Sequence, residues 1–226
     1  MKRLIAFFTC VMGASLFAAN AQATIIGTTG AVTEIAPPAS VEVGALESDT
    51  VVSAFAESQN VSLSGNLLIS FASPGTFTSN SPFPGGSILS GTIVNSYFLH
   101  FDPVGEPTNL VTVTGTVTFN EKILGVIAES PKLLNSDPLG ASGTTYPPDL
   151  SGLNANRGLE GSSQATLDTV TLSANLRTLS LDQLVATLAP DQIRVITQPV
   201  PEPGTLLLIG SGLVGIGVGA RRRRRS

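Results

Sequence analysis

Residues 111–119 read Val-Thr-Val-Thr-Gly-Thr-Val-Thr-Phe, and this stretch decides the fold class. Apart from the central glycine, apolar side chains take one parity and threonines take the other. This period of two is typical of a half-buried β-strand, because successive side chains of a strand point to opposite faces. The segment therefore predicts a strand with one apolar face and one threonine-lined face in water.

Segments on both sides of this strand also carry strand patterns. The expected strands are 61–71 (Val61, Leu63, Leu67, Ile69, Phe71), 93–101 (Ile93, Tyr97, Leu99, Phe101), 123–127 (apolar throughout and so covered on both faces), 170–176 (Val170, Leu172, Ala174, Leu176) and a last strand with Ile193 and Val195. Gly65-Asn66 predicts a hairpin turn or bulge inside the first of them. The period shifts at Leu179 and Leu181, so we expect a turn or bulge near Arg177.

Helical patterns are scarce among these strands, although Leu181–Ala189 could form two helical turns before Pro190. The segments 73–86 and 135–161 are rich in Gly, Pro, Ser and Asn, which is typical of loops. Short strands separated by such loops favour a mainly β fold. We expect a single β-sandwich, jelly-roll-like, over residues 24–199, followed by a C-terminal transmembrane helix.

Charge is distributed unevenly along the chain. The formal net charge is −4, but Lys2, Arg3 and the five arginines 221–225 lie at the two ends. Without these seven positive charges, residues 4–220 carry −11. Such an acidic body would repel phosphate backbones, so no nucleic-acid partner is expected. The single cysteine, Cys10, excludes an intrachain disulfide.

The first 23 residues have the three parts of a secretory signal peptide. Lys2 and Arg3 are followed by an apolar run over 4–19 and by Ala21-Gln22-Ala23, the small-x-small pattern of a cleavage site. We expect cleavage after Ala23, with cleavage after Ala21 as the alternative, and an uncleaved membrane helix as the other interpretation. Export would need the Sec translocon and signal peptidase as partners.

The C-terminal segment 200–226 has three parts as well. Pro201, Glu202 and Pro203 precede an uncharged apolar stretch, which is followed by Arg221, Arg222, Arg223, Arg224 and Arg225. Residues 205–220 would span about 24 Å as a helix, a short membrane span. The basic tail 221–226 would stay in the cytoplasm by the positive-inside rule and stop transfer there.

This arrangement resembles the PEP-CTERM sorting signal of Gram-negative bacteria, in which a Pro-Glu-Pro motif precedes a short span and a basic tail. Pro201, Glu202 and Pro203 match that motif residue by residue. The resemblance implies processing by exosortase, a membrane-embedded transpeptidase-like enzyme. An ordinary tail anchor behind a proline-rich stalk is the alternative.

Candidate catalytic groups are few. His100 is the single histidine, and Asp102 shares its strand parity, so the pair could serve a nucleophile. The serines show no G-x-S-x-G elbow, and a partly exposed strand histidine is the simpler interpretation. Paired carboxylates such as Asp102 and Glu106 could cleave glycosides. The sequence has no Trp and only Tyr97 and Tyr146, which disfavours a sugar-stacking site.

Two further motifs have structural explanations. Asn154, Asn156, Gly158 and Glu160 place oxygen donors at the alternate positions of some calcium loops, but Arg157 lies among them, so we expect a turn series. Asn60-Val61-Ser62 fits a glycosylation sequon by chance. No metal or cofactor is expected.

The sequence thus favours an exported, non-catalytic cell-surface or matrix protein associated with exopolysaccharide in a biofilm. It would exist first as an inner-membrane precursor. Two alternatives stay open: a carbohydrate-binding or carbohydrate-active jelly-roll protein with the same sorting signal, and a permanently tail-anchored envelope protein.

Overall fold

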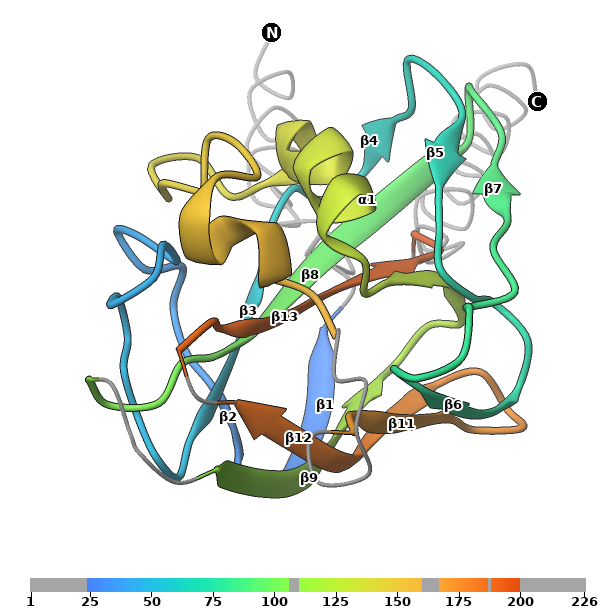
Figure 1. Cartoon of the computed structure of the whole chain (residues 1–226). Coiled ribbons are helices and arrows are strands. Elements are labelled where there is room, and N and C mark those ends of the chain that lie inside the picture. Colours follow the sequence, from blue (N-terminus) through green and yellow to red (C-terminus); the bar gives the residue numbers. More distant parts are fainter. Residues whose placement is uncertain (1–23, 106–109, 160–166, 187, 200–226) are drawn as a thin grey trace, which may run out of the picture. The chain divides into compact units, whose positions relative to one another are not determined.

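The threonine-rich segment forms β9 (Val111–Phe119), as predicted, and is the second strand of a five-stranded antiparallel sheet. A computed structural model describes residues 24–105, 110–159, 167–186 and 188–199 of the chain (Figure 1). The first sheet, in spatial order, consists of β1 (Ile25–Gly30), β9, β12 (Thr178–Ala186), β11 (Thr169–Leu172) and β6 (Gly75–Thr78). The side chains of Val113, Val117 and Phe119 are buried, whereas Thr112 and Thr114 are exposed.

A second sheet packs against the first. In spatial order it consists of β10 (Ile123–Ile127), β13 (Asp191–Thr197), β8 (Ile93–Phe101), β3 (Val52–Ala56) and β2 (Val32–Glu34), with β4 (Val61–Ser62) also paired to β8. The pair β2–β3 is parallel and the other pairs are antiparallel. A short ladder joins β5 (Leu67–Leu68) to β7 (Ser87–Ile88).

The main hydrophobic core takes side chains from both large sheets. Val117 and Leu179 of the first sheet belong to the same buried cluster as Leu99 and Val195 of the second. The rings of Tyr97 and Phe119 lie 4.8 Å apart between centroids, which joins β8 to β9 directly. The two sheets therefore pack face to face around one core.

The second sheet is buried on its other face too. There Phe55, Phe98 and Ile196 form a second cluster with Leu133 and Leu139, which lie in α1 (Ser130–Ser136) and the 3-10 helix Asp137–Leu139. Figure 1 shows α1 and the neighbouring 3-10 helix Gly152–Asn156 over β8 and β13. Strand β8 is consequently buried from Val94 to Phe101, whichever way its side chains point.

Four sequence predictions need correction. The segment 73–86, predicted as a loop, contains the strand β6. Leu181–Ala186 belongs to the strand β12 and not to a helix. The 61–71 segment forms the separate strands β4 and β5 rather than one strand, although Leu63, Leu67, Ile69 and Phe71 are all buried as predicted. Strand β11 ends at Leu172, and the expected turn before Thr178 contains Leu176 with φ of 58°.

Predictions at 123–127 and around Ile193 are confirmed by β10 and β13. The helix α1 was not predicted. It begins with Pro131 in its first turn, a known helix-start signal, but its seven residues are too few for a helical period to be recognised.

Gly115 of β9 is required for the close approach of β1. A Cβ atom at this position would lie 2.5 Å from the carbonyl oxygen of Thr29 and 2.9 Å from Cγ2 of Val32. Gly115→Ala should therefore lower the free energy of unfolding by about 1–3 kcal/mol, as overpacking does. Gly27→Ala in the same strand pair is the matched control, because its Cβ would meet nothing within 4 Å. Equal urea midpoints for the two variants would contradict this role of Gly115.

Candidate functional site

The sorting and cleavage residues predicted from the sequence lie outside the described part of the chain. These are Ala21, Ala23, Pro201, Glu202, Pro203 and Arg221 to Arg225, together with the expected span 205–220. Among the described residues, no helix is long and apolar enough to cross a membrane.

His100 is buried, with 1% of its surface exposed, so the expectation of a partly exposed strand histidine was wrong. Segments that pack over β8 and β13, among them the loop at Ala45, account for the difference. They bury a face that strand parity alone predicted to be exposed to water. Nε2 of His100 lies 2.8 Å from the carbonyl oxygen of Ala45, and Nδ1 lies 3.1 Å from Nε2 of Gln192.

These partners determine the tautomer of His100. The carbonyl of Ala45 only accepts, so Nε2 must carry the proton, and Nδ1 then accepts from the amide of Gln192. A second proton on Nδ1 would face the amide donor of Gln192. Burial lowers the pKa of His100 to about 4, despite the bond to Ala45. Both ring nitrogens are thus hydrogen-bonded to neutral groups of the fold.

Asp102 lies just beyond β8 and contacts the same loop as His100. Its Oδ2 accepts the backbone N–H of Gly44 at 2.7 Å, and its carbonyl accepts the N–H of Ser48. Burial raises the pKa of Asp102 to about 6, although the bond from Gly44 acts in the opposite direction. The structure thus places His100 and Asp102 against the same loop. The hydrogen-bond partner of Nδ1 of His100 is nevertheless Gln192 and not Asp102.

The structure describes the other predicted motifs only in part. Glu106 and Glu160 lie outside the described residues, so neither the Asp102–Glu106 pair nor the calcium loop is complete there. Residues 152–156 form a 3-10 helix instead of a turn series, and Arg157 is buried directly after it. Asn60 is exposed with φ of 55°. Within the described ranges, no group of three His, Cys, Asp or Glu side chains could hold a metal ion.

A buried ion-pair network lies between β13 and the covering helices, and sequence analysis missed it. Nε and Nη2 of Arg194 donate to the two oxygens of Glu57 at 2.7 and 2.8 Å, and both side chains are fully buried. Nη1 of Arg194 donates to the carbonyl of Leu133 and to Oγ of Ser136, and Nη2 also donates to Oδ1 of Asp137. All five N–H donors of this guanidinium are therefore used.

The network continues on both sides of Arg194. Arg157 donates from Nη1 and Nη2 to the carboxylate of Asp137 and from Nε to Oε1 of Gln192. The hydroxyl of Tyr146 donates to Oε1 of Glu57 at 2.6 Å, and burial together with this carboxylate raises the pKa of Tyr146. Such extensive pairing is the condition under which charges are stable in a low-dielectric interior. The cluster fixes α1 and its neighbours to the second sheet.

The outer face of the first sheet carries rows of hydroxyl groups, as the threonine parity predicted for β9. One row crosses all five strands, because each residue is the register partner of the next: Thr29, Thr116, Ser180, Thr171 and Thr76. Oγ1 atoms lie 2.7 Å apart in the Thr29–Thr116 and Thr76–Thr171 pairs. This face offers hydroxyl donors and acceptors in a regular array, with the carboxylate of Asp182 beside them, bonded by the hydroxyl of Thr171.

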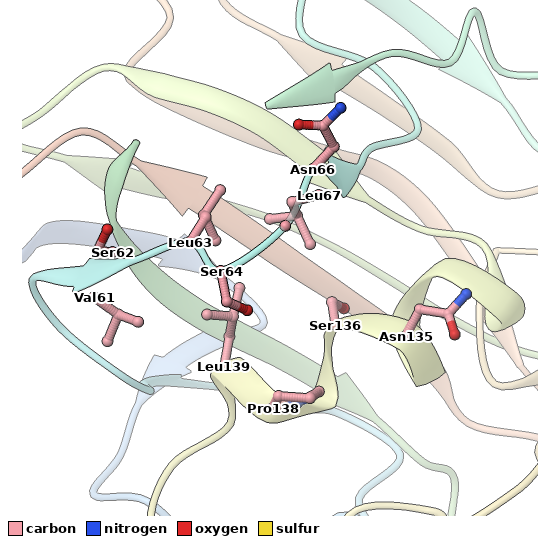
Figure 2. Close-up of a pocket in the computed structure, with 11 residues that line it drawn as sticks. Val61, Ser62, Leu63, Ser64, Asn66, Leu67, Asn135, Ser136, Pro138 and Leu139 are labelled. Atoms are coloured by element: carbon pink, nitrogen blue, oxygen red, sulfur yellow. The ribbon is translucent and has the colours of Figure 1, made fainter. Parts of the chain in front are cut away.

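A shallow pocket lies between the segment 61–67 and α1 with its following turn (Figure 2). Its cavity volume is about 280 Å³, and Leu63, Leu67 and Leu139 provide much of its apolar lining. In Figure 2 the amide groups of Asn66 and Asn135 point away from the space beside Leu139. Its lining side chains are apolar, serine or asparagine, so it provides no general acid or base.

Comparison with known proteins identifies the C-terminal segment. The family model described as the PEP-CTERM protein-sorting motif matches residues 199–224. Comparisons with curated proteins and with solved structures give no match. The matched range contains Pro201, Glu202, Pro203 and four of the five terminal arginines. The resemblance stated from the sequence is confirmed: residues 199–224 are a PEP-CTERM sorting motif.

Proposed function

We propose that this protein is an exported, non-catalytic component of the cell surface or extracellular matrix that associates with exopolysaccharide. The observation that carries the proposal is the PEP-CTERM motif at 199–224, which implies passage through a membrane and exosortase as the processing partner. The signal peptide 1–23, the span 205–220 and the tail 221–226 complete the proposed route, with an inner-membrane precursor before processing.

A structural role for the domain 24–199 is supported by the bonding of its polar groups. His100 and Asp102 hold the loop that contains Gly44 and Ala45, and Arg194 and Glu57 hold α1. We propose that the two packed sheets form the predicted jelly-roll-like β-sandwich, an architecture that lectin domains also use.

The hydroxyl row from Thr29 to Thr76 supports the exopolysaccharide part of the proposal. A neutral glycan presents hydroxyl groups that exchange hydrogen bonds with threonine and serine side chains, and a regular sheet face can contact several sugars at once. Binding to a polysaccharide array without cleavage would support this association, whereas cleavage of the arrayed glycans would favour the carbohydrate-active alternative. Retention of the full-length chain in the membrane would instead favour the tail-anchored alternative.

Changing Pro201, Glu202 and Pro203 together to alanine should block processing. The change lets the stalk continue into the following helix and removes the acidic side chain that a recognition pocket could bind. In cells that contain exosortase, we expect a full-length, membrane-bound precursor, detected by immunoblotting of membrane and released fractions. Pro37→Ala with Pro38→Ala, in the folded domain, is the matched control and should be processed normally.

A second variant separates recognition from membrane anchoring. Neutral replacements at Arg221–Arg225 remove the charge that stops transfer, so uncut protein should appear in the periplasm. If the alanine variant of the Pro-Glu-Pro motif were processed and released like the wild type, the stalk would be a spacer and exosortase recognition at this motif would be refuted.

A further inference from the structure

The backbone of Thr24, directly before β1, is held by the turn between β9 and β10. Its N–H donates to Oδ1 of Asn120 at 2.8 Å, and its carbonyl accepts the N–H of Asn120 at 3.3 Å. The register of β1 with β9 extends to the pair Ile25 and Phe119, so this position is fixed by the sheet. The nitrogen of Thr24 therefore has a defined place beside the turn.

Glu121 in this turn has an unused acceptor. Its side chain is buried, with 7% of the residue exposed, and its Oε2 has no hydrogen-bond partner among the described residues. Burial raises the pKa of Glu121, and the backbone N–H groups of Glu121 and Thr24 act in the opposite direction. A buried carboxylate oxygen without a donor costs free energy, so this group is suited to binding a further cation or donor.

We propose that Asn120 and Glu121 form a binding site for the α-ammonium group of Thr24, which cleavage after Ala23 creates. The inference rests on the signal-peptide cleavage in the proposed function. Hydrolysis adds one water across the Ala23–Thr24 bond, with the hydroxyl going to the carbonyl of Ala23 and the proton to the nitrogen of Thr24. The resulting amine binds a second proton at neutral pH.

The new ammonium group matches what the turn provides. It has three N–H donors where the peptide had one, and it brings a positive charge to the neighbourhood of the Glu121 carboxylate. Cleavage after Ala21 would leave the charge two residues away from this position. Signal-peptide removal would therefore complete the bonding of the turn, and β1 would be more firmly attached in the mature protein than in the precursor.

Other charged and titratable groups surround this site. Lys122 lies in the same turn, and Arg177 from the β11–β12 turn lowers the pKa of Glu121 through its charge. On the core side, burial and the charges of Glu121 and Glu34 raise the pKa of Tyr97. The ammonium group would thus compete with Arg177 for Glu121, and the test must isolate the carboxylate.

The test uses the chain 24–226 in detergent, released from a fusion partner so that Thr24 is the first residue. The chemical shift of Thr24 Cα, followed by NMR from pH 5 to 11, gives the pKa of its amine. We expect a value about one unit above the ordinary 7.7–8.0, a tenfold higher proton affinity. Glu121→Gln should return the pKa to the ordinary range, and Glu42→Gln, a carboxylate elsewhere, should leave it raised.

Stability gives a second readout. Nα-acetylation restores the neutral amide of the precursor, so it should lower the thermal midpoint at pH 7 in the wild type but not in Glu121→Gln. Because the folded-state pKa of the amine is raised, the stabilisation is present below pH 7.7 and is lost as the pH rises through the raised pKa.

An ordinary pKa at Thr24, or an equally raised pKa in Glu121→Gln, would overturn the inference. Edman sequencing of the exported protein addresses the other premise. A first residue other than Thr24 would refute the proposed cleavage position, and with it the use of this site in the cell, even if the purified chain shows the raised pKa.

Discussion

Replacing Arg194 with methionine should lower the free energy of unfolding by about 3–5 kcal/mol, the usual cost of breaking a buried ion pair by removing one partner. The Glu57 carboxylate is fully buried and receives two bonds from Arg194, so the variant leaves it as an uncompensated charge. Methionine keeps an apolar side chain of similar length but supplies no donor. Urea unfolding at pH 7, followed by circular dichroism, measures the loss.

Lys122→Met is the matched control, because Lys122 is exposed. Such a surface change should stay within about 0.5 kcal/mol of the wild type. The double variant Arg194→Met with Glu57→Gln removes both charges, so it should be more stable than Arg194→Met alone. A loss in Arg194→Met no larger than that of the control, or strictly additive losses in the double variant, would contradict the role of this pair.

The burial of Arg194 also shows what the local sequence pattern could not predict. Alternation places Arg194 on the face of β13 opposite Ile193 and Val195, which a half-buried strand would leave in water. In the structure α1 and the following turn cover that face. Long-range contacts decide which segment covers a sheet, and the local periodicity of the sequence contains no information about these contacts. Ile196, apolar on the same face as Arg194, was the one available signal.

The helical interpretation of Leu181–Ala189 failed for a specific geometric reason. The register of β12 with β9 shifts between Leu181 and Leu184, which is a β-bulge or similar irregularity. Both residues are buried in the main core although they are three positions apart. A spacing of three breaks the period of two and imitates a helix. The uninterrupted alternation in β9 has no such ambiguity, which explains why that strand was predicted correctly.

The strand prediction for the segment 61–71 was half right for a related reason. Alternation correctly predicted the buried residues, from Leu63 to Phe71, because it reports which side chains leave water. It does not report hydrogen-bond partners, and here β4 pairs with β8 whereas β5 pairs with β7. In the same way, the sequence predicted the shared parity of His100 and Asp102 but not their contacts with the loop at Ala45.

Between pH 7 and pH 4.5, His100→Gln and Asp102→Asn should change the pH dependence of stability in opposite directions. The folded-state pKa of His100, about 4, lies below the ordinary 6.5. The contribution of His100 to the free energy of unfolding is therefore present above pH 6.5 and is lost as the pH falls towards 4. The folded-state pKa of Asp102, about 6, lies above the ordinary 3.8. The contribution of Asp102 to the free energy of unfolding is therefore present below pH 3.8 and is lost as the pH rises through 6.

The two contributions to stability oppose each other in the wild type, each amounting to about 2 kcal/mol over this range. His100→Gln keeps only the Asp102 contribution, so it should gain stability relative to the wild type on acidification. Asp102→Asn keeps only the His100 contribution and should lose a similar amount. Urea unfolding of the three proteins at both pH values measures these differences, and carboxylates elsewhere cancel because all three share them. If the free energy of unfolding changed equally with pH in all three proteins, neither group would change its protonation on unfolding, and the shifted pKa values of His100 and Asp102 would be contradicted.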